Sequence, residues 1–522
     1  MTNKFSRLAI GAAAIALFAG GAMAETVTLK SYDGAVALTG DLTKFENNTY
    51  YLRTLIGEIA VSATQVSCEG AGCPEIELSA EFAIKGSDTI GAALMPALLL
   101  GYADQLEADV VQSRGATEGS MSMELLGADG EELAKVDLES AGSSTGFRAM
   151  LSNDAAIAMS SRQIRDEEIE RFAGAGFEGM TTPQREQVLA LDGLAVIVSP
   201  ANPVDSLSIL DIADIFSGAI TNWDEVGGPD LPITVVARND ESGTFGEFNA
   251  QILRPNGVEI VPEAKRFESN ELLSDEVAVT PGAIGFTGLP YVRSSKAVAI
   301  RTECGLVATP DSFGIKTEEY PLARRLYLYT TGAALPEQAQ KLLDYTKSDD
   351  AQQVIADAGF VDQGIDVRPV NMQGVRFAMA FTDPSPEFSF GQMRELMNEL
   401  MSAQRLSTTF RFNPGSSQLD NKAQGDVERV VDYLMRPENA GRDVMLVGFT
   451  DSVGRSDLNR ALSFRRADQV RASIVEAGGQ SLLERVNIRV LGYGELAPVG
   501  CNETLLGRSI NRRVEIWMRD AL

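Results

Sequence analysis

Four short segments between residues 85 and 244 combine hydroxyl side chains, glycines and arginine. Residues 85–90 read Lys-Gly-Ser-Asp-Thr-Ile, 141–146 read Ala-Gly-Ser-Ser-Thr-Gly, 157–162 read Ile-Ala-Met-Ser-Ser-Arg, and 238–244 read Arg-Asn-Asp-Glu-Ser-Gly-Thr. Three of them place Ser or Thr beside Gly at the expected start of a helix, where free N–H groups and the helix dipole favour an anion. Each segment alone also fits an ordinary helix cap. Three of them in one region, with an arginine four residues before one of the serines, predict a site for a dehydrated oxyanion.

A second pairing of opposite charges stands in the last part of the chain. Residues 448–454 read Gly-Phe-Thr-Asp-Ser-Val-Gly, so Asp451 follows an apolar segment that is expected to be a strand. Arg466 lies fifteen residues later, on an expected helix that begins near Leu458. This arrangement can set a carboxylate and a guanidinium close together at the edge of a sheet. An ordinary surface salt bridge would show the same two residues.

The patterning of the chain predicts the elements that hold these segments. Residues 25–80 alternate apolar and polar positions and are expected to form a small β-rich module. In residues 81–375, short apolar strands alternate with helical stretches, which is typical of α/β architecture. Residues 376–407 combine a Thr-Asp-Pro-Ser-Pro linker signal with a helical segment. Residues 408–522 follow a compact α+β pattern.

Residues 81–370 resemble the phosphate-specific substrate-binding proteins of ABC transporters, a branch of the periplasmic binding proteins. The resemblance rests on the four segments above together with residues 191–200, 214–218, 221–223 and 281–286. It implies a type II fold in which two α/β lobes, joined by a hinge, close on an anion without performing chemistry on it. The phosphate-binding residues that it implies are Ser87, Thr89, Ile90, Ser143, Ser161, Arg162, Arg238, Ser242, Gly243 and Thr244.

The third segment departs from the pattern of that family. Many members place an aspartate where this chain has Ser161, which is followed by Arg162. In the family, that aspartate accepts the proton of monohydrogen phosphate and so rejects sulfate, which carries no proton. Because a serine hydroxyl can donate as well as accept a hydrogen bond, the sequence leaves the choice between phosphate and another oxyanion open.

Residues 408–518 resemble the OmpA-like C-terminal domain, and the family's fifteen-residue step is preserved from Asp451 to Arg466. That family binds the diaminopimelate stem of peptidoglycan non-covalently. The resemblance implies that Asp451 meets the ammonium group of the stem and that Arg466 meets its carboxylate, with help from Asn459. The family's closing Asn-Arg-Arg also matches, and its two arginines are expected to be structural or accessory.

The composition excludes several classes of function. At 522 residues, 44% of them hydrophobic and 23% charged, the chain can form three or four ordinary globular domains. The formal net charge of −28 argues against nucleic acid as a partner. The acidity belongs to residues 25–407, with 27 basic and 58 acidic side chains, whereas residues 408–520 hold 16 and 15. Because the chain has no histidine, we expect no Ser-His-Asp triad and no His-ligated metal. We also expect no cofactor and no enzyme activity.

The first residues and the cysteines indicate a secreted protein. Residues 1–24 combine two basic residues, an apolar run and Ala-Met-Ala, which predicts a secretory signal rather than a membrane anchor. Cys68 and Cys73 enclose two glycines and are expected to form a local disulfide. Cys304 and Cys501 stand in different expected domains, and their pairing stays open.

These observations favour a periplasmic protein, tethered to peptidoglycan, that binds phosphate or a similar oxyanion for uptake or sensing. An ABC transporter permease is a further expected partner. The alternative is a structural or signalling envelope protein whose binding fold contacts a protein partner and does not bind phosphate. A third interpretation, hydrolysis of phosphate esters, is disfavoured because histidine, a metal cluster and an activated nucleophile are missing. The sequence leaves open the role of residues 25–80 and the oligomeric state.

Overall fold

The computed structural model divides the chain into two compact units, Met1–Glu77 and Leu78–Leu522, which are described separately. The predicted leader, residues 1–24, and the predicted linker signal, residues 382–386, lie outside the described residues. The structure describes residues 26–31, 36–46, 49–55, 57–62, 66–74, 81–117, 119–302, 304–379, 390–412 and 419–520. No helix in these ranges is both long enough and apolar enough to cross a membrane.

The N-terminal unit is a five-stranded antiparallel sheet with the order β4-β3-β2-β1-β5. Alternate residues of β1 and β3 point to one face, where Leu29 and Leu52 are buried, as the two-residue period of a strand requires. A disulfide joins Cys68 to Cys73, as the sequence predicts. The strands are β1 (Thr26–Ser31), β2 (Ala37–Glu46), β3 (Thr49–Thr54), β4 (Gly57–Ser62) and β5 (Val66–Glu69).

The second unit begins with an α/β lobe. Its apolar core lies between strands β6 and β9 and helices α1, α8 and α9, while α2 and α3 supply a second cluster around Phe147 and Phe172. The elements of this lobe are β6 (Glu81–Gly86), η1 (Ile90–Leu94), α1 (Met95–Gln105), β7 (Asp109–Arg114), β8 (Ser120–Leu126), β9 (Glu132–Ser140), α2 (Ser143–Leu151), β10 (Ile157–Ser160), α3 (Asp166–Gly174), α8 (Glu337–Tyr345) and α9 (Asp349–Asp357).

A second α/β lobe has its own core around Phe216, Trp223 and Phe286. Helix α4 starts where Ser208 and Asp211 cap each other's backbone N–H groups, a sequence-encoded helix start. The elements are β11 (Glu186–Val198), β12 (Ser206–Ser208), α4 (Ile209–Ser217), η2 (Trp223–Val226), β13 (Thr234–Arg238), α5 (Gly243–Phe248), η3 (Asn249–Leu253), η4 (Arg254–Asn256), β14 (Lys265–Phe267), α6 (Asn270–Val279), β15 (Ala283–Gly288), η5 (Leu289–Tyr291), β16 (Lys296–Ala297), β17 (Ala299–Arg301), β18 (Val307–Ala308), α7 (Ser312–Lys316) and β19 (Ala323–Tyr329).

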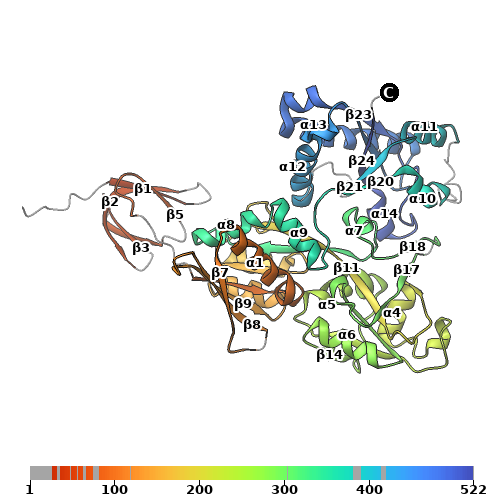
Figure 1. Ribbon diagram of the computed structural model, residues 1–522, viewed down its shortest axis with the longest axis horizontal. Helices are drawn as coiled ribbons and strands as arrows, with labels where there is room; N and C mark the ends of the chain where they lie inside the picture. Colours follow the sequence, from red (N-terminus) through yellow and green to blue (C-terminus); the bar gives the residue numbers. More distant parts are fainter. Residues whose placement is uncertain are drawn as a thin grey trace, which may run out of the picture. The chain divides into compact units, whose positions relative to one another are not determined.

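Strands β11 and β19 join the lobes, and Figure 1 shows β11 running between them. They pair with each other antiparallel, β11 continues into the second lobe beside β15, and β19 continues into the first lobe beside β10. Strand β11 is buried at every position from Leu189 to Val198, as expected for a strand covered on both faces. The architecture is therefore the two-lobed α/β fold that the sequence predicts.

The C-terminal domain is a five-stranded sheet with the order β20-β21-β24-β22-β23. Helices α12 and α13 lie on one side of the sheet and α11 lies on the other (Figure 1). Alternate residues of β22 pack against these two layers. Because β20 pairs with β21, the sheet already begins at Val367, before the predicted boundary at residue 375. The elements are β20 (Val367–Pro369), η6 (Val370–Gln373), α10 (Gly374–Met379), α11 (Phe390–Leu400), β21 (Gln404–Arg411), α12 (Asn421–Met435), η7 (Pro437–Asn439), β22 (Asp443–Phe449), α13 (Ser456–Arg485), β23 (Asn487–Gly492), α14 (Leu505–Asn511) and β24 (Arg513–Arg519).

A disulfide between Cys304 and Cys501, a pairing that the sequence leaves open, links the second lobe to the C-terminal domain. Buried Arg405 of β21 also forms an ion pair with Glu319, at 2.5 Å between Nη2 and Oε1. Arg325 of β19 forms an ion pair with Asp420, at 2.8 Å between Nη1 and Oδ2. The C-terminal domain is thus held by one covalent bond and by ion pairs that include a strand of the hinge.

Candidate functional site

The first predicted segment enters the space between the lobes directly after strand β6. Gly86 has φ 135° and lies so close to the neighbouring strand that a Cβ atom would stand 2.2 Å from the Met159 carbonyl oxygen, so only glycine fits. The following residues, Ser87 and Thr89, are buried. The Thr89 and Thr244 hydroxyls share a hydrogen bond of 3.0 Å. The first segment therefore meets the fourth across the two lobes.

The second and third segments meet at two buried serines. The Ser161 N–H donates to the Ser143 Oγ at 3.1 Å, and the two hydroxyl oxygens are 3.5 Å apart. Gly243 of the fourth segment closes on the same pair, because a Cβ atom there would lie 2.1 Å from the Ser143 Oγ and 2.3 Å from the Ser161 Oγ. The structure therefore brings all four segments together, and the fourth presents its backbone to the serines of the other two.

Arg238 ends strand β13 and is buried. Its Nη1 lies 3.2 Å from the Asp88 Oδ2, and its Nε donates to the Phe267 carbonyl oxygen at 3.3 Å. Burial lowers the pKa of the Arg238 guanidinium, and the Asp88 carboxylate opposes that shift. Burial also disfavours the charged form of Asp88, and this raises the pKa of its carboxyl group to about 6. A cation and an anion are thus fixed beside the buried hydroxyls.

Three other predicted residues have a more local role. Arg162 departs from the expectation, because its guanidinium forms a bidentate pair with Glu168 of α3 at 2.7 and 2.8 Å and donates to the Ser144 Oγ. Its Nη1 and Nη2 atoms therefore donate to residues of α2 and α3, whereas its buried Nε has no hydrogen-bond partner among the described residues. Ser242 caps α5 by accepting the Phe245 N–H at 3.4 Å. Ile90 opens η1 with a buried side chain.

Sequence reasoning missed a second buried arginine. Arg324 of β19 forms an ion pair with Asp192 of β11 at 2.6 Å and donates to the Thr244 Oγ1 at 2.9 Å. Asn270, at the start of α6, donates to the Thr89 Oγ1 at 3.2 Å. A usable signal was Asp192 itself, since a charged residue inside an apolar strand is expected to be buried with a partner.

The C-terminal domain brings its predicted residues to the end of β22. The Asn459 Nδ2 donates to the Asp451 carbonyl oxygen at 3.4 Å, and Arg466 is buried on α13 with its guanidinium 5.1 Å from the centre of the Phe412 ring. The Asp451 carboxylate pairs with Arg512 at 2.8 Å, so this accessory arginine contacts the predicted site directly. Burial and the charge of Arg512 lower the pKa of Arg466 to about 10, while Asp451 opposes the shift.

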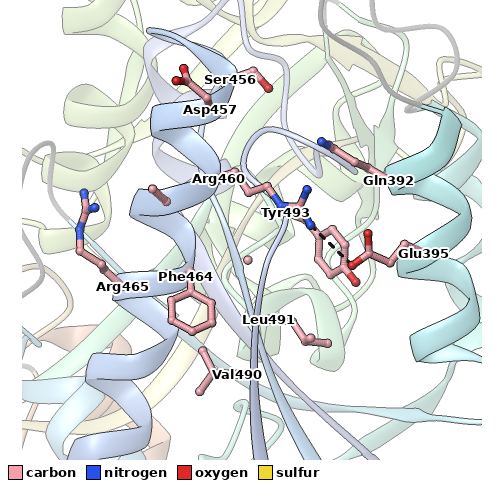
Figure 2. Close-up of a pocket in the computed structure, with 12 residues that line it drawn as sticks. Gln392, Glu395, Ser456, Asp457, Arg460, Phe464, Arg465, Val490, Leu491 and Tyr493 are labelled. Carbon is pink, nitrogen blue, oxygen red and sulfur yellow. Dashed lines mark ion pairs between the residues drawn. The ribbon is translucent and has the colours of Figure 1, made fainter.

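A groove of about 930 Å³ lies on another side of α13 (Figure 2). Figure 2 shows Arg460 of α13 and Glu395 of α11 pointing toward each other beside the Tyr493 ring, with their charged atoms 3.5 Å apart. Phe464 and Val490 supply apolar surface to the same groove. The groove therefore offers aromatic and charged side chains on the helix that carries Asn459 and Arg466.

A smaller cavity of about 430 Å³ borders both candidate sites. Arg324 and Tyr327 of the hinge strand line one part of it, and Phe412 and Arg512 of the C-terminal domain line another. Arg324 also donates to Thr244, whereas Arg512 pairs with Asp451. The lining of the cavity therefore includes, for each candidate site, one arginine that contacts it.

Comparison with known proteins agrees with this division. Residues 104–350 match the PBP superfamily domain, and residues 411–512 match the OmpA family. The Phosphate-binding protein PstS of Bacillus subtilis is 31% identical over 229 residues, which cover 44% of this chain and 71% of the relative. PstS of Borreliella burgdorferi is 27% identical over 234 residues, which cover 44% and 79%.

The chain is also similar to solved structures. The crystal structure of an ABC-type phosphate transport receptor from Vibrio cholerae is 27% identical, covers 54% of this chain and 99% of its own, and has a TM-score of 0.40. The curated PstS relatives and the two domain matches together identify the family. The chain belongs to the phosphate-binding proteins of the PBP superfamily and carries a C-terminal domain of the OmpA family.

Proposed function

We propose that this protein is an envelope receptor that binds inorganic phosphate between its two lobes. The observation that carries the proposal is the convergence of four separate segments on one buried place, where the Thr89, Ser143 and Thr244 hydroxyls lie beside Arg238 and Arg324. Hydrogen bonds from fixed N–H, O–H and guanidinium donors can replace the water of a dehydrated oxyanion. The receptor serves uptake or sensing, and an ABC transporter permease is its proposed partner in uptake.

The C-terminal domain is proposed to attach the receptor to peptidoglycan. Asp451 and Arg466 provide opposite charges for the ammonium and carboxylate groups of a diaminopimelate stem, and Asn459 lies beside Asp451. A zwitterion is recognised by charged partners of both signs at a fixed spacing. This attachment and the secretory signal predicted in residues 1–24 both support a periplasmic location, which we propose for the protein.

Isothermal titration of the mature protein with phosphate, sulfate and arsenate in separate runs tests the anion site. Tight binding of phosphate supports the receptor function. Absence of heat with all three anions, for protein shown to be folded by circular dichroism, would reject it and favour a structural or signalling role. Steady release of nitrophenol from a model phosphate ester would contradict the proposal that the protein is not an enzyme.

A further inference from the structure

A carboxylate of the first segment, and not of the third, lies beside the hydroxyls of the proposed anion site. Asp88 stands between Ser87 and Thr89 and is only 7% exposed. Its Oδ2 lies 3.2 Å from the Arg238 Nη1 and accepts hydrogen bonds from the Asn270 side chain at 3.0 Å and backbone N–H at 3.3 Å. These contacts all use Oδ2 and fix the position of the carboxyl group.

Hydrogen bonds connect this carboxylate to the hydroxyls of the site. The Asn270 amide that donates to Asp88 also donates to the Thr89 Oγ1, at 3.2 Å, and Thr89 contacts the Thr244 hydroxyl of the second lobe. On the other side of Asp88, the buried Ser87 Oγ has no hydrogen-bond partner among the described residues. A buried hydroxyl without a partner is costly, which indicates a place that a ligand satisfies.

The chemistry of the anions makes such a carboxylate informative. Hydrogen-bond donors alone do not separate phosphate from sulfate, because both anions present four oxygens of similar geometry. At mildly basic pH, phosphate keeps one proton and sulfate keeps none, so an acceptor in the site favours phosphate and repels sulfate. The Ser161 hydroxyl cannot enforce this choice, because it can donate as well as accept.

We propose that Asp88 accepts the hydrogen bond from the protonated oxygen of phosphate and thereby excludes sulfate from the site. The proton stays on phosphate, and the Asp88 carboxylate stays ionised. This inference rests on the proposed phosphate-binding function. It assigns to the first segment the selectivity that the aspartate of the third segment provides elsewhere in the family. Selection of phosphate is then compatible with a serine, Ser161, in the place of that aspartate.

The surroundings of Asp88 set the pH range in which this acceptor works. Burial raises the pKa of Asp88 to about 6, Arg238 of β13 lowers it, and Glu271 of α6 raises it. Tyr291 of η5, whose own pKa is raised by burial and by the charge of Asp88, donates to the Thr89 carbonyl oxygen at 2.8 Å. Above that pKa the carboxylate is an acceptor. Below it, the protonated group can donate to a sulfate oxygen.

Titration calorimetry of the full mature chain with phosphate and with sulfate, at about pH 8, tests the inference in three proteins. The wild type should bind phosphate and not sulfate. Asp88→Asn should bind phosphate about ten-fold more weakly and should now bind sulfate, because the amide can donate to it. Asp240→Asn is the matched control, since this aspartate follows Arg238 by two residues but its side chain is 84% exposed, and it should behave as the wild type.

The outcomes separate the inference from the function on which it rests. If the wild type binds none of the anions, the proposed function and the inference both fail. If the wild type selects phosphate and folded Asp88→Asn keeps the same selectivity, only the inference fails. If Asp88→Asn does not fold, the same titration of the wild type at several pH values tests the inference. Sulfate binding should appear as the pH is lowered from about 8 to about 5, and continued rejection of sulfate over this range overturns the inference.

Discussion

The disulfide between Cys304 and Cys501 should carry a large share of the stability of the C-terminal domain. The two cysteines are 197 residues apart in the sequence. Closing a loop of that length lowers the entropy of the unfolded chain by an amount equivalent to about 5 kcal/mol at 25 °C. The ion pair between Arg405 and Glu319 remains without the disulfide, but the net contribution of a buried ion pair is small because the cost of desolvating both charges offsets their attraction. The double substitution Cys304→Ser/Cys501→Ser should therefore lower the free energy of unfolding of the C-terminal domain by several kcal/mol.

The two tryptophans of the chain allow the loss to be located. Trp223 is buried in the core of the second lobe, and Trp517 is buried in the C-terminal sheet. Denaturant unfolding is followed by tryptophan fluorescence, with and without the disulfide. The Trp223→Phe background leaves Trp517 as the reporter, and the Trp517→Phe background leaves Trp223. The transition reported by Trp517 should move to a lower denaturant concentration and separate from the transition reported by Trp223.

The N-terminal disulfide provides the control. Cys68 and Cys73 close a loop with a sequence separation of only 5, in the other compact unit, so Cys68→Ser/Cys73→Ser should leave both tryptophan transitions in place. A loss below about 1 kcal/mol in the Trp517 transition of Cys304→Ser/Cys501→Ser would refute the reasoning, because the loop-closure estimate exceeds it several-fold.

Three other predictions follow from the sites. Asp192→Asn leaves its buried arginine partner unpaired, which costs roughly 3–5 kcal/mol, so the melting temperature should fall and added phosphate should restore part of it. Gly243→Ala places a Cβ atom 2.1 Å from a serine hydroxyl of the first lobe, so calorimetry should show weaker phosphate binding; unchanged affinity would contradict the close approach. Asp451→Ala and Arg466→Ala should each release the protein from sacculi in a pelleting assay, whereas Asp457→Ala should remain bound.

The sequence predicts those parts of the site that depend on local chain geometry. Glycine beside a hydroxyl residue at a helix start led to Thr89, Ser143 and Gly243, and the structure brings all three segments together. The short spacing of Cys68 and Cys73 likewise identified their disulfide. In each case neighbouring residues in the chain carry the signal, because turns and helix starts are set by local backbone conformation.

Contacts between distant segments could not be predicted in this way. The pairing of Cys304 with Cys501 depends on how two domains meet, and the pairing of Arg324 with Asp192 depends on the register of two hinge strands. The position of Arg162 in the third segment predicts a role in the anion site, but in the fold its guanidinium pairs with Glu168 of α3. Which partner a charged side chain finds is decided by packing.

The placement of charge explains how an acidic protein can hold an anion. Residues 25–407 carry 27 basic and 58 acidic side chains, so their distant field repels an anion. Within the site, Arg238 is paired with Asp88 at 3.2 Å and Arg324 with Asp192 at 2.6 Å, so these four groups together bring no net charge. Surface charge is screened beyond about 8–10 Å at physiological salt, whereas hydrogen-bond donors act at contact. Affinity therefore depends on the buried donors, and the acidic surface affects chiefly the rate of association.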